Sequence, residues 1–272
     1  MRLYPELNVR SLGFACLRVA LLTYVLYGLI LYVGQDSMLY FPEQQPFAEC
    51  DDLSPAERIT MNGTRGYFFQ NGSSTKLAVL YHGNAGRACD RAYYQSALTH
   101  AGYSWLMVEY TGYAGDGHKP TSQSVLEDVS RTVAWTKDQN FSHIAVLGES
   151  IGAGAASYHA FIGEVDQLIL LTPFARLSDV AQDYYPVYPI GLLMRDDFDN
   201  AAWAAAAGDV FIIYGTTDTI IPNKHAIALF NALPEGRKRS LAINGDHNDV
   251  PAFGETQVAI MRFLTEESEI GP

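Results

Sequence analysis

Basic residues and cysteines are both scarce in this chain of 272 residues. Lys and Arg together number 18 against 30 for Asp and Glu, which gives a net charge of −12. A surface this acidic repels phosphate backbones, and the sequence shows no basic patch, so nucleic acid is not an expected partner. The 3 cysteines are too few for a disulfide scaffold and lack the spacing of a metal site. We therefore expect neither a metal nor a cofactor.

Internal repeats and low-complexity segments are also lacking. The chain is 48% hydrophobic and 18% charged, which excludes a disordered chain, a coiled coil and a collagen-like repeat. About 240 residues remain after an apolar N-terminal segment, a length that suits a single α/β domain.

The apolar segment covers residues 14–34 and is interrupted only by Arg18. A helix of this length reaches about 31 Å, close to the hydrocarbon thickness of a bilayer. Arg18 lies near one end, from which its side chain can extend to the headgroups. We interpret the segment as an uncleaved membrane anchor. A cleaved signal peptide and a buried core helix are the alternatives, although no small-residue cleavage site follows directly.

Flanking charges predict the orientation of this anchor. Arg2, Arg10 and Arg18 lie before or within it, whereas after it no Lys or Arg occurs before Arg58. The positive-inside rule then places the N-terminus in the cytosol and the rest of the chain outside it, in a periplasmic, luminal or extracellular space. In an oxidising compartment Cys50 and Cys89 could pair, and two free thiols fit the sequence equally well. The predicted divisions are a cytosolic tail (1–13), a transmembrane anchor (14–34), a juxtamembrane linker (35–57) and a globular domain (58–268).

Strand and helix patterns alternate through the globular domain. Continuous apolar runs are typical of strands buried on both faces of a parallel sheet, and two Asn-Gly turns predict an antiparallel hairpin before them. Ser124 and Glu127 have the spacing of a capping box. The pattern predicts a mostly parallel, doubly wound α/β sheet. The expected strands are 77–81, 105–108, 144–147, 168–171, 210–214 and 240–243, and the expected helices are 87–101, 122–138, one starting at 150, 223–232 and 252–266.

An apolar insertion interrupts this alternation over residues 175–206. We interpret it as a short lid over a binding site; the alternative is that its side chains complete the core. The lid interpretation makes four of its residues candidates for substrate binding: Tyr184, Tyr185, Leu192 and Leu193.

A G-x-S-x-G motif, Gly148-Glu149-Ser150-Ile151-Gly152, directly follows a predicted strand and precedes a helical stretch. This context is that of a nucleophilic serine on a strained strand-to-helix turn, with the helix N-terminus directed at developing negative charge. Asp218 and His247 each follow a later strand, in the chain order Ser, acid, His. His247 would act as the general base and Asp218 would orient it; Asp246 and Asp249 are alternative acids.

The turn His82-Gly83-Asn84-Ala85-Gly86 follows another strand. The N–H groups of Asn84 and Ile151 are the expected oxyanion donors. The glycine-rich loop 112–117 lacks the helix and acidic partner of a dinucleotide site, so we expect it beside the active site.

Together, the segments YHGNAG, GYAGDGHKPT, GESIGAG, DTIIP and GDHND resemble the α/β-hydrolase superfamily. More narrowly, the chain resembles membrane-anchored α/β-hydrolase-domain proteins, which include protein depalmitoylases and serine-aminopeptidase-like relatives. The resemblance covers about residues 36–268 and implies the α/β-hydrolase fold. The chain departs from the group at GYAGDGHKP, where GYG followed by a serine is usual, and it has a helix in place of the depalmitoylases' cysteine clusters.

These residues predict a membrane-anchored serine hydrolase that cleaves a carboxylic ester or thioester through an acyl-enzyme. The apolar insertion and the anchor favour small-molecule or lipid-like acyl substrates over peptides. An aminopeptidase or acyltransferase on the same triad is one alternative. A non-catalytic binding protein is another, although such proteins typically lose the serine or the histidine.

Overall fold

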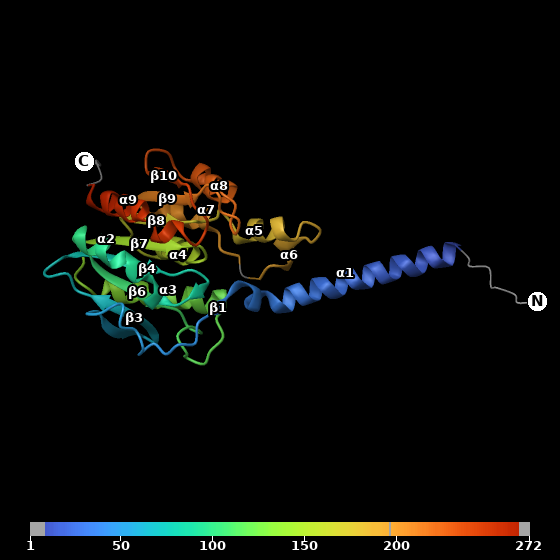
Figure 1. Cartoon of the computed structure of the whole chain (residues 1–272), viewed down its shortest axis with the longest axis horizontal. Helices are drawn as coiled ribbons and strands as arrows, with labels where there is room; N and C mark the ends of the chain where they lie inside the picture. The colour runs from blue at the N-terminus through green and yellow to red at the C-terminus, as the bar shows by residue number, and fades with distance from the viewer. Residues whose placement is uncertain (1–8, 196, 267–272) are drawn as a thin grey trace, which may run out of the picture.

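The structure is a computed structural model that describes residues 9–195 and 197–266. Residues 1–8 of the predicted cytosolic tail, including Arg2, and residues 267–268 of the predicted globular domain lie outside the described residues. The chain begins with a long helix, α1 (Val9–Leu39), that projects away from the globular part (Figure 1). This helix is long and apolar enough to cross a membrane. It extends into the predicted linker and ends at Leu39.

The centre of the globular part is an eight-stranded sheet in the order β10-β9-β8-β7-β4-β6-β3-β2. β2 and β3 form the predicted antiparallel hairpin, β3 pairs antiparallel with β6, and the other neighbours are parallel. The mostly parallel sheet predicted from the sequence is thus confirmed. The strands are β2 (Glu57–Met61), β3 (Thr64–Phe69), β4 (Lys76–Tyr81), β6 (Ser104–Glu109), β7 (His143–Glu149), β8 (Gln167–Leu171), β9 (Asp209–Gly215) and β10 (Lys238–Ile243).

Helices cover both faces of this sheet, which explains the continuous apolar runs of its strands. In β4, Leu77 and Val79 join the core beneath α3, α4 and α8, whereas Ala78 and Leu80 join the core beneath α2 and α9. Successive side chains of a strand point to opposite faces, so both faces need apolar residues when both are covered. The covering helices are α2 (Gln95–His100), α3 (Ser122–Lys137), α4 (Gly152–Ile162), α8 (Lys224–Ala232) and α9 (Gly254–Thr265).

Two local predictions were wrong. The capping box of α3 is formed by Thr121 and Ser124, not by Ser124 and Glu127. The Thr121 hydroxyl accepts the Ser124 N–H, so the helix begins before Ser124, and Glu127 lies inside it, where it pairs with Arg131. The helix expected over 87–101 is instead a 3-10 segment, η1 (Ala88–Tyr94), followed by the short α2.

The linker after α1 packs onto the globular part. Its first residues form β1 (Phe41–Pro42), which pairs in parallel with β5 (Ala85–Gly86) in a separate two-stranded sheet. Further along, Cys50 forms a disulfide with Cys89 of η1, with their Cα atoms 5.9 Å apart. Of the two arrangements that the sequence allowed for these cysteines, the structure has the paired one.

The insertion folds into short helices, α5 (Leu177–Tyr184), α6 (Ile190–Leu193) and α7 (Asn200–Trp203), followed by the 3-10 turn η2 (Ala204–Ala206). α5 and α6 lie on the side of the domain from which α1 projects (Figure 1). The rings of Tyr188 and Tyr24 stack with centroids 4.5 Å apart, and Arg195 forms an ion pair with Asp36. The insertion therefore packs along the C-terminal half of α1.

Candidate active site

Ser150 lies on the turn between β7 and α4, with a positive φ of 53°. Non-glycine residues rarely adopt this conformation, and it is a feature of strained functional turns. A Cβ on Gly148 would lie 2.2 Å from the carbonyl oxygen of Gly152, and a Cβ on Gly152 would lie 2.3 Å from that of Tyr81. The glycines of the motif are therefore required by close packing around the serine turn.

His247 and Asp218 form a buried pair, with His247 Nδ1 and Asp218 Oδ2 2.7 Å apart. The other oxygen of Asp218 accepts the backbone N–H groups of Ile220 and Ile221, at 2.9 and 2.7 Å. Three hydrogen-bond partners therefore fix the orientation of this carboxyl group. With Nδ1 paired to Asp218, Nε2 is the ring nitrogen left to accept a proton from the nucleophile.

Asp246 binds backbone N–H groups, whereas an orienting acid would bind the imidazole ring of His247. Its Oδ1 accepts the backbone N–H groups of His247 and Thr219, at 2.8 and 3.1 Å. These hydrogen bonds lower the pKa of Asp246. The imidazole ring is thus paired with Asp218 rather than with Asp246 or Asp249.

Asn84 is held by contacts on several sides. Its carbonyl oxygen accepts the Phe41 N–H at 2.9 Å and the Tyr113 hydroxyl at 2.7 Å. Its side-chain amide donates to the carbonyl of Leu39, the last residue of α1, at 3.0 Å. The turn that carries one predicted oxyanion donor is therefore bound directly to the end of α1 and to β1. Ile151, which carries the other, lies between Ser150 and α4.

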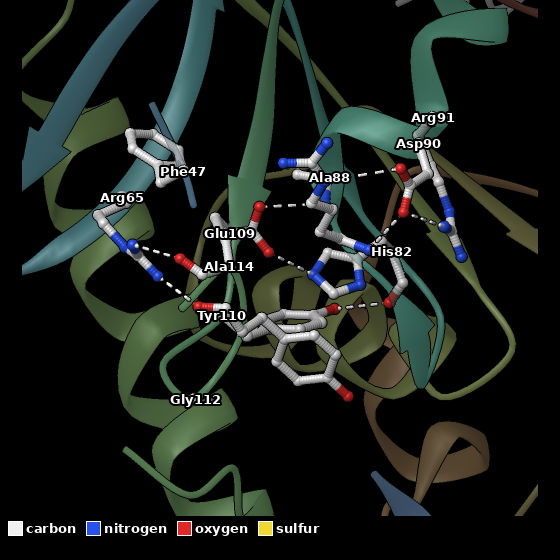
Figure 2. A network of polar contacts seen from close by, with 12 residues as sticks. Phe47, Arg65, His82, Ala88, Asp90, Arg91, Glu109, Tyr110, Gly112 and Ala114 are labelled. Carbon is white, nitrogen blue, oxygen red and sulfur yellow. Dashed lines mark hydrogen bonds and ion pairs between the residues drawn. The ribbon is translucent and has the colours of Figure 1, made fainter. Parts of the chain in front are cut away.

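A buried acid and a buried histidine lie beneath this turn (Figure 2). His82 Nε2 and Glu109 Oε1 are 3.4 Å apart, and both side chains are fully buried. The other oxygen of Glu109 accepts the Ala88 N–H at 3.2 Å, and the Tyr110 hydroxyl donates to the His82 carbonyl at 3.0 Å. Glu109 thus contacts both His82, at the start of the turn, and Ala88, in the segment after the turn.

Glu149, the residue before Ser150, is bound by three side chains. Arg91 Nε donates to it at 2.8 Å, the Tyr94 hydroxyl donates at 2.7 Å, and the Tyr93 hydroxyl also donates to it. Burial by itself raises the pKa of Glu149, but the Arg91 charge and the two hydroxyls outweigh it and leave this pKa below its usual value. The carboxylate therefore stays charged and fixes the chain on the N-terminal side of the nucleophile.

Ser150 and His247 line one cavity of about 390 Å³. Its walls include the predicted oxyanion residue Asn84 and two of the residues that bind Glu149, Arg91 and Tyr93. Thr172, with a φ of 44°, follows β8 at the same edge of the sheet. The lining residues are Gly83, Asn84, Ala85, Gly86, Asp90, Arg91, Tyr93, Glu149, Ser150, Thr172, His247, Asn248 and Pro251.

The residues expected to bind substrate from the insertion do not line this cavity. Tyr185 and Leu193 line a separate apolar pocket, with Leu31 and Leu39 of α1 on its other side. The Tyr184 hydroxyl donates to the carbonyl of Ile220, and Leu192 is 86% exposed. A role for these four residues in substrate binding stays a prediction.

Sequence reasoning missed Arg91, Glu109, Tyr93 and Thr172. Thr172 had a usable signal, since it directly follows a predicted strand. The glycine-rich loop 112–117 contacts the turn 82–86, through the Tyr113 hydroxyl at the carbonyl of Asn84, and also the linker, where the Ala114 N–H donates to the carbonyl of Glu43 at 3.0 Å. Arg65 donates to the carbonyl of Ala114 from the other side (Figure 2).

The sheet order, the positive-φ serine after β7 and the His–Asp pair after β10 and β9 define an α/β hydrolase. No family model matches the sequence. The chain is 31% identical over 270 residues to Rv2307c, an uncharacterized protein of Mycobacterium tuberculosis, covering 93% of this chain and 96% of that protein. The chain therefore belongs to the α/β-hydrolase superfamily and, within it, to the family of Rv2307c.

The chain is also similar to a more distant relative and, in its fold, to two solved structures. The α/β hydrolase domain-containing protein 17B of Xenopus tropicalis is 25% identical over 209 residues, which is 74% of this chain and 70% of that protein. The esterase Pf2001 of Pyrococcus furiosus has a TM-score of 0.64 at 18% identity, over 83% of this chain and 97% of that one. Est1E from Butyrivibrio proteoclasticus has a TM-score of 0.59 at 17% identity, over 78% and 96%.

Proposed function

We propose that this protein is a membrane-anchored serine hydrolase that cleaves carboxylic ester or thioester bonds of acyl substrates. The observation that carries the proposal is the 2.7 Å contact of His247 with Asp218 at a cavity that also contains Ser150. The fold that it shares with a protein described as an esterase supports an ester substrate.

In the proposed reaction, Ser150 Oγ attacks the substrate carbonyl while His247 Nε2 takes its proton. The carbonyl π-bond pair moves to oxygen, and the N–H groups of Asn84 and Ile151 stabilise the resulting oxyanion. Collapse of the tetrahedral intermediate breaks the bond to the leaving alcohol or thiol, which receives the proton from His247. Water, deprotonated by His247, then attacks the acyl-enzyme by the same route and releases the acid.

The location that we propose follows from α1 and from the disulfide. By the positive-inside rule, Arg2 and Arg10 before the predicted span and Arg18 near its start support a hydrolase domain outside the cytosol. The Cys50–Cys89 disulfide supports this side, because disulfides persist in oxidising compartments. In a Cys16→Ser background, accessibility to a membrane-impermeant maleimide of a cysteine introduced at Ser11, before the span, and of one introduced at Ile227 tests this orientation.

The decisive experiment for the chemistry is labelling of the full-length protein in detergent with a fluorophosphonate probe. Wild type should be labelled and Ser150→Ala should not. Hydrolysis of p-nitrophenyl esters, acyl thioesters and aminoacyl anilides then separates an esterase or thioesterase from an aminopeptidase. Labelling that persists in Ser150→Ala would overturn the proposal.

A further inference from the structure

An uncharged segment of the insertion lies beside α1 with apolar side chains facing outward. Residues 184–194 read YYPVYPIGLLM and contain no Asp, Glu, Lys or Arg. Val187 is 71% exposed and Leu192 is 86% exposed. Contact of such apolar side chains with water is energetically unfavourable. Charged residues resume at once on both sides, with Asp183 before the segment and Arg195 after it.

Residues 184–194, with Arg195 directly after them, contact α1 from Tyr24 to Asp36. At one end the Tyr24 hydroxyl donates to the carbonyl of Val187 at 3.0 Å, and the Tyr188 hydroxyl donates to the carbonyl of Tyr24 at 2.9 Å. At the other end Arg195 pairs with Asp36. Tyr24 lies about 18 Å along the helix from Asp36, at 1.5 Å per residue.

These contacts cannot all lie outside a bilayer that α1 spans. The part of α1 over residues 10–23 reaches only about 20 Å, whereas the hydrocarbon core is about 30 Å thick. A span over residues 14–34 instead places Tyr24 at its middle, and Tyr188 is stacked on Tyr24. We propose that residues 184–194, the membrane wedge, insert into the leaflet on the domain's side of the membrane, beside α1.

Entry into hydrocarbon requires that backbone polar groups find partners within the protein, and several of those in the wedge do. Pro186 and Pro189 have no N–H group. The N–H groups of Tyr188, Ile190 and Met194 donate to the carbonyls of Tyr185, Tyr188 and Ile190 at 2.8–3.0 Å. Gln35 Nε2 donates to the carbonyl of Leu193 at 2.9 Å.

Charged pairs mark where the wedge returns to water. Arg195 and Asp36 are 3.4 Å apart, level with the end of the predicted span, and Asp183 pairs with Lys224. The wedge is therefore an apolar element with an ion pair at each end, which is the charge pattern of a segment that dips into a leaflet and returns.

Quenching by brominated phospholipids tests the wedge in the full-length protein, reconstituted in phosphatidylcholine vesicles. In a Cys16→Ser background, an environment-sensitive fluorophore is attached in turn to Leu192→Cys, Val187→Cys, Leu21→Cys and Ile227→Cys. Leu21 reports on α1, and Ile227 is a matched exposed apolar residue on α8, away from the wedge. All four side chains are substantially exposed, so substitution should not disturb packing.

We expect strong loss of fluorescence at positions 21, 187 and 192 and none at 227. Insertion of the wedge presupposes the membrane span proposed above, and the four positions separate the two. Quenching at 21 with none at 187 and 192 overturns the wedge and leaves the span in place. Quenching at none of these three overturns both. Quenching at 227 equal to that at 192 also overturns the wedge, because it would mean that the whole domain lies on the lipid.

Discussion

His247 is bound through its ring to Asp218 and through its backbone N–H to its neighbour Asp246. These two acids have different consequences for catalysis under the proposed mechanism. Asp218→Asn should reduce kcat by roughly 10³–10⁴-fold, because an amide can hold the imidazole in the wrong tautomer. Asp246→Asn should cost far less, because its oxygen can still accept the same N–H. Steady-state ester hydrolysis checks both, and equal losses would contradict the assignment of the acid.

Arg91 and Glu149 should contribute strongly to stability. The Arg91 side chain is 15% exposed and that of Glu149 is 5% exposed, so removal of the cation leaves a buried, unpaired carboxylate. Arg91→Met should lower the free energy of unfolding by about 3 kcal/mol. The matched control is Arg176→Met, whose ion pair with Asp199 is half exposed and should be worth less than about 1 kcal/mol. Thermal unfolding in detergent micelles compares the two variants, and similar shifts in Tm would contradict the prediction.

Under the proposed mechanism, the backbone contact between β1 and the turn 82–86 should affect catalysis rather than substrate binding. Phe41→Pro removes the N–H that donates to the carbonyl of Asn84. Displacement of the turn should lower kcat roughly 10- to 100-fold with little change in KM. Phe41→Ala retains the N–H and removes a side chain that is 53% exposed, so it should behave as wild type. Equal activity of the two variants would show that β1 does not position the turn.

His159 should make stability depend on pH. Burial, with a smaller effect of the Lys137 charge, lowers its pKa from 6.5 to about 3. The native state then keeps His159 neutral at pH values where the unfolded chain binds a proton. Its stabilising contribution is complete above pH 6.5 and is lost as pH falls toward 3, by about 1.4 kcal/mol per pH unit.

The check is the dependence of Tm on pH in wild type and in His159→Asn, whose amide can still contact the Tyr81 hydroxyl that meets His159 Nδ1 at 2.9 Å. The variant should have a flatter profile between pH 6.5 and 4. Parallel profiles would show that another group causes the acid sensitivity.

The disulfide should hold the linker on the domain. Cys50 and Cys89 are 39 residues apart, and opening this loop should lower the free energy of unfolding by about 2–4 kcal/mol. A reducing agent should lower the Tm of wild type and leave that of a Cys50→Ser, Cys89→Ser double variant unchanged. A reductant effect of the same size in both would exclude the disulfide as its cause.

The parts of the molecule that could be predicted from sequence are those specified locally. Each buried strand is a short apolar run, and Ser150, Asp218 and His247 each follow one, so the topology of a parallel sheet brings them to one edge. Arg91 and Glu149 could not be paired in this way, because they lie 58 residues apart on different elements and the G-x-S-x-G motif accepts any residue at position 149. His82 and Glu109 could not be paired from the sequence either.

For the insertion, the sequence shows that the segment is apolar but not which part of the molecule it packs against. Its apolar residues predict a surface that must be covered, but periodicity does not identify what covers it. The sequence suggested a lid over the site, whereas Tyr185 and Leu193 share a pocket with Leu31 of α1. Contacts between segments more than 150 residues apart, such as that of Gln35 with Leu193, come from the tertiary fold and not from local pattern.

Only Tyr40 separates α1 from β1, and β1 is hydrogen-bonded to the turn 82–86. The hydrolase domain therefore has no flexible tether about which to swivel. In a bilayer, the domain would hold Ser150 at a constant height above the membrane and in a constant orientation. Substrates in the same membrane would then meet it by two-dimensional diffusion, so the turnover rate would follow their surface density rather than their concentration in bulk solution.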